Sequence, residues 1–381
     1  GAVWVVDAYA AALVEHAERL DGLSPGTALR VPQAELAAAL EALEPDLRAG
    51  LERARENVAA VAQATMMPAD RLVEIGPGHR VTVREVPVRR AAIYAPGGRN
   101  PYPSTVVMGA VTAEIAGVSE IVVCVPGGHP VMLAACALCG VTEVLRAGGA
   151  HAVAALGYGT EEIEPVDVVA GPGNLYVQEA KRLLAGTRFG VDGFAGPSDL
   201  LVLAGPDADP AVVAADLLAQ AEHGAGSVVG LIATDGAVVD SVSREIGDLD
   251  TGGVVAVAEV PGAAAALAVA EAFAPEHLEL IGADVEALAP RITRAGCTFV
   301  GRPSGVAFGD YIAGANHTLP TAGAARFASV LSARTFRRLT SVVELDDSAA
   351  AALAADAIPV AEAEGFARHA ASMRLRQNPG S

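Results

Sequence analysis

The sequence has few cysteines and no long uninterrupted hydrophobic run. Its four cysteines are too few for a disulfide scaffold, and Cys124, Cys136 and Cys139 lie within apolar segments. Cys136 and Cys139 form a CxxC pair without a second pair or a nearby His pair, so we interpret both as small buried hydrophobes. This usage is typical of a reducing compartment, and we expect a cytoplasmic protein. Gly, Pro or a charged residue interrupts every apolar segment before the ~20 residues that a bilayer span needs, which predicts no membrane span.

Basic residues are also scarce. The chain has 26 Lys and Arg residues against 45 Asp and Glu residues, and its formal net charge is −19. Such a chain repels a polyphosphate backbone, and no Lys/Arg cluster forms a local basic patch against that field. We therefore expect no nucleic-acid partner.

Length and composition favour a large globular protein. The chain has 381 residues, of which 52% are hydrophobic and 19% are charged, and this is more apolar than a disordered chain. A single core stops growing at roughly 250–300 residues, so the length predicts two domains.

The N-terminal segment has the pattern of helices. Between about Asp7 and Ala64, apolar side chains recur at helical spacing, as at Leu36, Leu40, Leu43, Leu47 and Leu51. From His79 to Glu85 the pattern changes to period two, which predicts a half-buried strand.

Four short apolar runs follow, and each ends in a glycine turn. Strand, glycine turn and helix in repetition predict βαβ units on a parallel sheet. Such turns let a ligand phosphate approach the N–H groups at a helix N-terminus, so the pattern permits a dinucleotide. It does not identify one, because a strict GxGxxG is absent and glycine turns also occur in folds that bind no nucleotide. The predicted strands are Arg90–Tyr94, Glu120–Val125, Glu143–Ala147 and Val166–Ala170.

A second series of strands and helices resembles the first and is consistent with a duplication. The tail from about Arg334 to Ser381 has an amphipathic, helical pattern, and we expect a terminal arm that grips a partner subunit. The predicted strands are Leu200–Leu203, Val228–Ile232, Val254–Val257, Leu278–Ile281 and Thr298–Val300, and the predicted helices are Pro210–Glu222, Ala237–Ile246, Ala263–Ala272 and Val285–Ala295.

Two short motifs could carry chemistry. Gln220 and His223 are three residues apart at the end of a predicted helix, so they share a face and could chelate a metal. A histidine at a helix end is more often a surface group stabilised by the helix dipole. Glu276 and His277 place an acid beside a base just before a strand, which suits proton transfer. A solvated loop dipeptide is the alternative.

Further candidates lie in loops and in the C-terminal arm. Asp310 and His317 belong to a loop of polar residues among small ones, where site residues are common. Glu364 and His369 belong to the arm, where an ordinary exposed helix face is the alternative. His151 follows a Gly-Gly turn and could face a cofactor.

Taken together, seven segments in this order resemble the histidinol dehydrogenase family, from about Asp7 to Arg376. They are Tyr94-Ala-Pro-Gly-Gly98, Gly171-Pro-Gly-Asn174, Ala195-Gly-Pro-Ser198, Gln220-Ala-Glu-His223, Pro275-Glu-His277, Gly309-Asp310-Tyr311 with Asn316-His317-x-Leu-Pro320, and Glu364 with His369.

The resemblance implies an NAD-dependent, zinc-binding dehydrogenase of histidine biosynthesis that oxidises L-histidinol to L-histidine through the aldehyde. His277 would take the hydroxyl proton, and Glu276 would activate the water that hydrates the aldehyde. The metal, one Zn²⁺ per subunit, would orient the carbinol carbon toward the nicotinamide. Its implied ligands are Gln220, His223 and Asp310 with His369 from the other subunit of a homodimer, so that active sites are shared.

The remaining implied site residues line the substrate and cofactor pockets. Ser198, His317 and Glu364 would contact the substrate, together with His277 and the four metal ligands. Tyr94, His151 and Asn174 match the positions at which the family contacts NAD.

The implied fold is α/β, with two incomplete Rossmann-like βαβ domains on parallel sheets and a helical C-terminal dimerisation arm. Residues 1–93 and 198–330 would form the first domain, with N-terminal helices and most zinc and substrate residues. Residues 94–197 would form the second, NAD-binding domain, and residues 331–381 would form the arm that contributes to the site of the partner subunit.

Three positions depart from the family pattern. His151 stands where the family usually has Gln, Asp199 replaces a common Glu, and Val306 replaces a common Glu before the Gly-Asp-Tyr loop. These differences leave two alternatives open. One is a relative that oxidises a different polar primary alcohol, such as a sulfonated diol, with the same zinc and NAD chemistry. The other is an inactive metal-binding homologue.

Overall fold

Contacts divide the chain into two units. The computed structural model describes residues 2–97, 100–224, 226–247 and 253–377, so Gly98 of the first motif and the last four residues lie outside the described residues. The main unit comprises Gly1–Thr65 and Val88–Phe336, and the small unit comprises Met66–Pro87 and Arg337–Ser381. The α/β class with two parallel sheets and a mostly helical C-terminal region is confirmed.

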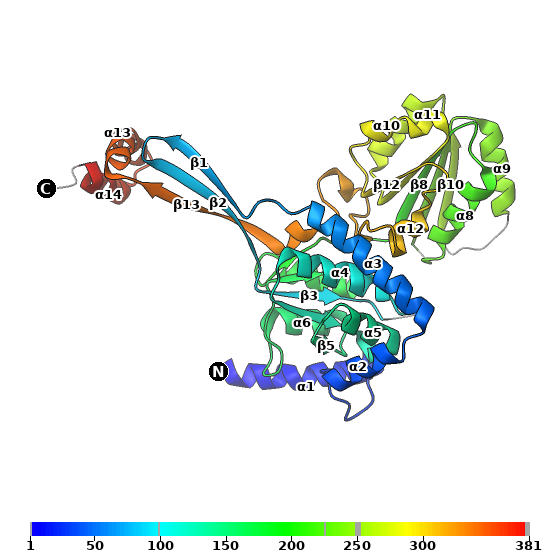
Figure 1. Cartoon of the computed structure of the whole chain (residues 1–381), viewed down its shortest axis with the longest axis horizontal. Helices are drawn as coiled ribbons and strands as arrows, with labels where there is room; N and C mark the ends of the chain where they lie inside the picture. The colour runs from blue at the N-terminus through cyan, green and yellow to red at the C-terminus, as the bar shows by residue number, and fades with distance from the viewer. Residues whose placement is uncertain (1, 98–99, 225, 248–252, 378–381) are drawn as a thin grey trace. The chain divides into compact units, whose positions relative to one another are not determined.

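The first sheet of the main unit consists of five parallel strands in the order β5-β4-β3-β6-β7. Its strands are β3 (Arg90–Tyr94), β4 (Glu120–Cys124), β5 (Glu143–Leu145), β6 (Val168–Ala170) and β7 (Gly190–Val191). The helices between them are α4 (Pro103–Ala116), α5 (Pro130–Leu138), α6 (Gly149–Tyr158) and α7 (Leu175–Leu184), with the 3-10 turn η1 (Pro126–Gly128). The four predicted strands therefore form, and helices cover both faces of the sheet (Figure 1).

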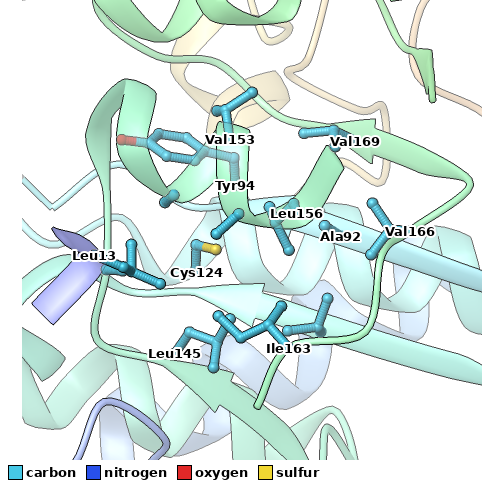
Figure 2. Close-up of a cluster of buried hydrophobic side chains, with 14 of the residues drawn as sticks. Leu13, Ala92, Tyr94, Cys124, Leu145, Val153, Leu156, Ile163, Val166 and Val169 are labelled. Atoms are coloured by element: carbon cyan, nitrogen blue, oxygen red, sulfur yellow. The ribbon is translucent and has the colours of Figure 1, made fainter. Parts of the chain in front are cut away.

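The N-terminal helices pack on this first sheet. These helices are α1 (Ala2–Leu20), α2 (Gln33–Glu41) and α3 (Pro45–Ala64). Leu13 of α1 lies in one buried cluster with Tyr94 of β3, Cys124 of β4 and Leu156 of α6, and Figure 2 shows these side chains together. The apolar face of α1 is buried against the strands of residues 90–191. The boundaries of the domains implied by the resemblance stay a prediction.

The second sheet has the same strand order, β10-β9-β8-β11-β12, and is also parallel. Its strands are β8 (Asp199–Ala204), β9 (Val228–Ala233), β10 (Val254–Glu259), β11 (His277–Ile281) and β12 (Cys297–Val300). Its helices are α8 (Pro210–Ala221), α9 (Gly236–Ile246), α10 (Ala263–Phe273), α11 (Ala283–Glu286) and α12 (Val306–Tyr311), followed by the turns η3 (Ala324–Arg326) and η4 (Ala333–Phe336).

Successive side chains along β8 and β11 point to opposite faces of the second sheet, and this decides which helices each side chain packs against. Leu200 and Val202 pack toward α8 and α9, whereas Leu201 and Leu203 pack toward α10 and α11, and Figure 1 shows these helices on opposite faces. On β11, Ile281 faces α8, so His277 and Glu279 share that face by period two.

The predicted helix Val285–Ala295 is wrong over most of its length. Only the short α11 and the 3-10 turn η2 (Ala289–Arg291) form there. Pro290 lies within this segment and has no N–H to donate to a preceding helical turn, which explains the interruption.

The small unit combines a three-stranded antiparallel sheet with two helices. Strands β1 (Asp70–Gly76), β2 (His79–Pro87) and β13 (Arg337–Leu345) pair in the order β1-β2-β13, and α13 (Asp347–Ala363) and α14 (Ala367–Gln377) follow (Figure 1). The predicted strand at 79–85 is confirmed. The prediction of a helical tail from about Arg334 is wrong for 337–345, because this segment pairs along its whole length with β2. Val342 and Val343 favour such an extended backbone.

Three of the four cysteines pack inside the fold. Cys124, Cys136 and Cys139 are buried, and burial raises the pKa of the Cys124 and Cys139 thiols to about 12, so all three behave as small hydrophobes. Among the described residues, no helix combines the length and apolarity needed to cross a bilayer.

Candidate functional site

Four of the predicted site residues meet where strands β8 and β11 begin. Ser198 directly precedes β8, while Glu276 directly precedes β11 and His277 is the first residue of that strand. Helix α8 ends at Ala221, and its buried Gln220 belongs to the same hydrogen-bonded group as Ser198 and Glu276. The amino ends of two neighbouring parallel strands and the last turn of a helix thus assemble polar groups from three distant parts of the sequence.

Glu276 is held by a network of hydrogen bonds. The Ser198 hydroxyl donates to Glu276 Oε2 at 2.6 Å, and the Asp199 N–H donates to the same oxygen at 3.0 Å. The Gln220 amide donates in turn to the Ser198 hydroxyl oxygen. Burial raises the pKa of Glu276, although the His277 charge and these hydrogen bonds oppose the rise. A carboxyl group with a raised pKa is suited to hold and release a proton near neutral pH.

Asp199 is a supporting residue to which sequence reasoning gave no role. Its Oδ1 accepts the Glu276 N–H at 2.7 Å and its Oδ2 accepts the Ala322 N–H at 3.3 Å. Asp199 and Glu276 therefore each accept the backbone N–H of the other. The only signal in the sequence is that Asp199 replaces a common Glu of the resembling family.

His277 lies between two carboxylates. Its Nε2 is 3.5 Å from Asp310 Oδ1, its Nδ1 is 3.7 Å from Glu276 Oε2, and its ring centroid is 6.0 Å from that of Phe299. Burial lowers the pKa of His277, but the hydrogen bond to Asp310 and the charges of both carboxylates outweigh it, so the pKa is raised. For Asp310, burial raises the pKa, but His277 and the nearby histidines lower it more.

His223 and His317 complete the surroundings of Asp310. His223 Nδ1 lies 3.0 Å from the Gln220 carbonyl oxygen, which orients the ring and leaves Nε2 for another partner. His317 Nδ1 donates to the Asp310 carbonyl oxygen at 3.0 Å, and its Nε2 lies 3.0 Å from the hydroxyl of Thr105. Burial lowers the pKa of His317, so its neutral form is favoured. Thr105, at the start of α4, carries no recognisable motif in the sequence.

The donor set fits a divalent metal. Gln220 Oε1 is buried without a hydrogen-bond partner in the described structure, and His223 and Asp310 supply an imidazole nitrogen and a carboxylate. Nitrogen and oxygen donors of these types suit zinc. Among the described residues, no group of three or more His, Cys, Asp and Glu side chains is placed to hold a metal. Of the four predicted zinc ligands, only His223 and Asp310 are of these residue types and lie in the main unit. Gln220 is an amide, and His369 lies in the small unit.

Glu364 and His369, the other predicted site residues, lie in the small unit. Glu364 follows α13 at its C-terminal end and His369 lies in α14, and both side chains are exposed. The ring centroids of His369 and Phe366 are 5.2 Å apart. Their role in a site of a partner subunit stays a prediction.

The three predicted cofactor residues line one cavity of about 1040 Å³ at the carboxyl ends of the first sheet. Tyr94 ends β3, His151 lies in the first turn of α6, and Asn174 precedes α7, where its side chain accepts the Tyr176 and Val177 N–H groups. The crevice between β3 and β6 is the point at which the strand order reverses, where α/β sheets usually bind ligands. The cavity is large enough for a cofactor-sized molecule.

Asp21 organises the wall of this cavity. It accepts the Gly148 N–H at 2.7 Å and pairs with His151 Nε2 at 2.9 Å. The Gly149 N–H is likewise bound by the Tyr94 hydroxyl oxygen at 2.9 Å, and burial raises the pKa of Tyr94 to about 12. Asp21 was missed from the sequence because it lies 130 positions from His151 in a loop without a motif.

The sequence of the chain matches one family over nearly its whole length. The family model described as histidinol dehydrogenase matches residues 5–377. The chain is 44% identical to histidinol dehydrogenase of Parasynechococcus marenigrum over 96% of the chain and 87% of that protein. It is 43% identical to histidinol dehydrogenase of Nocardia farcinica over the same shares of the two chains.

Solved structures show the same fold. The crystal structure of histidinol dehydrogenase from Elizabethkingia anophelis matches with a TM-score of 0.89 and 31% identity over 96% of this chain and 88% of that chain. An NAD-dependent aldehyde dehydrogenase from Sinorhizobium meliloti matches with a TM-score of 0.55 at 15% identity, over 88% of this chain and 80% of that chain. That second match shows a likeness of fold alone.

Proposed function

Because the chain belongs to the histidinol dehydrogenase family and is an oxidoreductase, we propose that it oxidises L-histidinol to L-histidine with NAD and zinc. L-histidinol, two NAD⁺ and one water give L-histidine, two NADH and three protons, so four electrons leave as two hydrides. The observation that carries the proposal is the polar group of Ser198, Gln220, Glu276, His277 and Asp310 beside the amino ends of β8 and β11, of which Gln220, Glu276 and His277 are buried.

In this proposal His277 accepts the proton of the substrate hydroxyl. Its ring is buried and sits 3.5 Å from the Asp310 carboxylate, which stabilises the protonated imidazole and so strengthens it as a base. The packing against Phe299 orients the ring. A base in this position supports both oxidation steps, because each step removes a hydroxyl proton from the carbon that is oxidised.

Glu276 activates the water that hydrates the aldehyde between the two oxidations. Ser198 and the Asp199 N–H orient one oxygen of this carboxylate, Oε2. Removal of a proton from water needs the ionised carboxylate, and its raised pKa makes Glu276 a stronger base than an ordinary carboxylate. His317 and Ser198 line the substrate side of the same group.

Zinc, one ion per subunit, would be held by Gln220, His223 and Asp310 of one subunit and by His369 of the partner subunit. When bound, this ion would supply Lewis-acid chemistry that orients the substrate alcohol. The buried and unpartnered Gln220 Oε1 supports this assignment. On this proposal the small unit, with Glu364 and His369, serves as the dimerisation arm of a homodimer.

NAD supplies the hydride acceptor, and we assign its binding to the cavity lined by Tyr94, His151 and Asn174. Asp21 keeps the His151 ring and the Gly148 N–H in place at the cavity wall. The imidazole can still donate or accept a hydrogen bond where the family usually has the amide of Gln.

Formation of NADH in a spectrophotometric assay tests the proposal. With L-histidinol we expect two equivalents of NADH per substrate and one equivalent of L-histidine. Turnover of a sulfonated diol but not of histidinol would identify a relative with another substrate. Stoichiometric zinc binding without reduction of NAD with any alcohol would identify an inactive homologue.

Subunit exchange tests the shared site. His369→Ala and His223→Ala should each lose zinc and activity, because each removes one ligand. Mixing the two inactive proteins should partly restore both, since one of the two mixed sites would combine four intact ligands. No recovery after verified exchange would contradict a site shared between subunits.

A further inference from the structure

Helix α7 presents two polar side chains to the loops on either side of it. Gln178 and Lys181 are three residues apart and share one helix face. One loop is the glycine loop, Gly171–Asn174, which connects β6 to α7. The other is the linking segment, Asp192–Ser198, which runs from the end of β7 to the start of β8.

Lys181 and Asp192 form a buried ion pair that holds Gly171 by both of its backbone groups. Lys181 Nζ lies 2.5 Å from Asp192 Oδ1 and donates to the Gly171 carbonyl oxygen at 3.0 Å. Asp192 Oδ2 accepts the Gly171 N–H at 2.8 Å, and its Oδ1 also accepts the Gly193 N–H. The exposed fractions of the two side chains are only 1% and 6%. A buried pair of this kind is favourable only when further hydrogen bonds satisfy both ions, as they do here.

Lys181 is the only lysine among the 26 Lys and Arg residues of the chain. Arginine serves at every other basic position, including the buried Arg90 and Arg146. A compact ammonium group can donate to a carbonyl oxygen and a carboxylate within one small enclosed space, whereas a planar guanidinium group is larger and has a different donor geometry. The contacts of Lys181 thus explain a lysine at this position.

Gln178 joins the other end of the glycine loop to the linking segment. Its amide donates to the Gly173 carbonyl oxygen at 3.3 Å, and its side-chain oxygen accepts the Ala195 N–H at 3.0 Å. The linking segment ends at Ser198, whose hydroxyl donates to Glu276. A continuous set of contacts therefore connects the loop that carries Asn174 with the proposed proton-transfer group.

We propose that Gln178 and Lys181 are positioning residues that hold the glycine loop and the linking segment in one arrangement. This inference rests on the proposed function, in which Asn174 contacts NAD and Glu276 activates water. Neither side chain touches the reacting atoms. Their effect is to fix the cofactor pocket and the Ser198–Glu276 pair in one position relative to each other. Loss of these contacts therefore weakens cofactor binding and turnover together.

Gln178→Met is the main test, because it removes both hydrogen bonds without leaving a buried charge. We expect the KM for NAD to rise and kcat to fall, each by about tenfold, as loss of one or two hydrogen bonds predicts. Zinc content should match that of the unaltered enzyme. Gln33→Met is the matched control, since Gln33 also donates to a backbone carbonyl, that of Thr142, but lies away from both loops. A KM and kcat within twofold of the unaltered enzyme would overturn the proposal.

Gln178→Glu separates the two contacts of this side chain. The carboxylate can still accept the Ala195 N–H but cannot donate to Gly173. We expect kcat to recover relative to Gln178→Met while the KM for NAD stays high. A kcat as low as that of Gln178→Met would show that the contact with Ala195 does not position the Ser198–Glu276 pair, and that result would contradict the proposed link.

Amide hydrogen exchange of the enzyme without NAD provides a readout that needs no activity. In the double variant Lys181→Met with Asp192→Leu, both charges are removed, so no lone buried charge destabilises the fold. Exchange in residues 171–180 should be about tenfold faster, because local opening is no longer opposed by the bonds to Gly171. Arg182→Met, at an exposed ion pair on the same helix, is the control. Unchanged exchange would overturn the role of Lys181, whereas faster exchange in an enzyme that does not use NAD would reject only the proposed function.

Discussion

The two parallel sheets of the main unit share one strand order but place their polar groups at opposite edges. In the first sheet the cavity with Tyr94 and Asn174 lies at the carboxyl ends of β3 and β6. In the second sheet Ser198, Glu276 and His277 lie at the amino ends of β8 and β11. The carboxyl edge is the usual ligand site of such folds, so only the first sheet follows the common rule.

The carboxyl edge of the second sheet is closed by its own backbone. Gly205 and Gly282 approach so closely that a Cβ on Gly282 would lie 2.7 Å from the Gly205 Cα. Asp207 accepts the Ala283 N–H there, at 3.2 Å. In the first sheet Asp21 accepts the Gly148 N–H, in the turn after β5, and lines a large cavity. Equal topology therefore does not decide which edge becomes a site; the local packing after each strand does.

The edges of the two sheets are connected by hydrogen bonds within the main unit. Thr105, at the start of α4 on the first sheet, lies 3.0 Å from His317, whose other ring nitrogen contacts the Asp310 carbonyl oxygen. Gly196 of the linking segment donates to the Thr321 hydroxyl. The carboxyl edge of one sheet and the amino edge of the other thus belong to one bonded region, as a transfer between substrate and cofactor would require.

The largest effect should follow from His277→Gln at the amino edge of the second sheet. Loss of the proposed general base should lower kcat by about 10²–10⁴. Zinc content, measured by atomic absorption, should stay at that of the unaltered enzyme. Full activity of this variant would remove His277 from the mechanism and leave the amino edge without its principal base.

Asp21→Ala should loosen the wall of the cavity at the carboxyl edge of the first sheet. The Gly148 N–H and His151 lose their partner, so the free energy of unfolding should fall by about 1–3 kcal/mol in urea titrations. The KM for NAD should rise as well. Asp207→Ala, at the closed carboxyl edge of the second sheet, is the control: it should lose stability without a change in that KM. Equal kinetic effects of both variants would contradict the contrast between the two edges.

Glu279→Gln tests a pair of neighbouring carboxyl groups, the buried Glu279 and the half-buried Asp216. Burial and the neighbouring Asp216 raise the pKa of Glu279 from its ordinary value of 4.5 to about 9. Its contribution to stability is therefore complete below about pH 4.5 and is lost as the pH rises toward 9, because the unfolded chain releases this proton first. The variant should be more stable than the original by about 1–2 kcal/mol at pH 9 but not at pH 4.5. Parallel stability curves across this range would argue against a protonated Glu279.

The smallest effect should follow from His151→Gln, the same substitution as His277→Gln made at the other edge. The new amide can still donate to Asp21 and is the residue usual in the family at this position. The KM for NAD should change by less than about threefold, and kcat should not change. A loss of turnover comparable to that of His277→Gln would mean that the two edges do not divide cofactor binding and acid–base chemistry between them.

Much of the fold could be predicted from local pattern. Apolar runs located four strands of the first sheet, each followed by a glycine turn, and the five strands of the second, because a parallel strand is buried on both faces. The two-residue β7 was not predicted. The segment 337–345 was mistaken for helix since its strand character depends on pairing with β2, far away in sequence. Among site residues, motifs indicated Glu276, His277 and Gln220, whereas Asp199, Asp21 and Thr105 have no motif and became visible only through their contacts.

Local pattern is enough to identify most helices and strands, the excess of acidic over basic residues and the family to which the motifs point. Which edge of each sheet carries polar groups, and which side chains support them, depends on the packing of the folded chain. The reason is that these contacts join residues far apart in the chain, such as Glu276 with Asp199, 77 positions away, and Asp21 with His151, 130 positions away. Local pattern constrains the backbone of neighbouring residues, but long-range packing selects the partners of a buried charge.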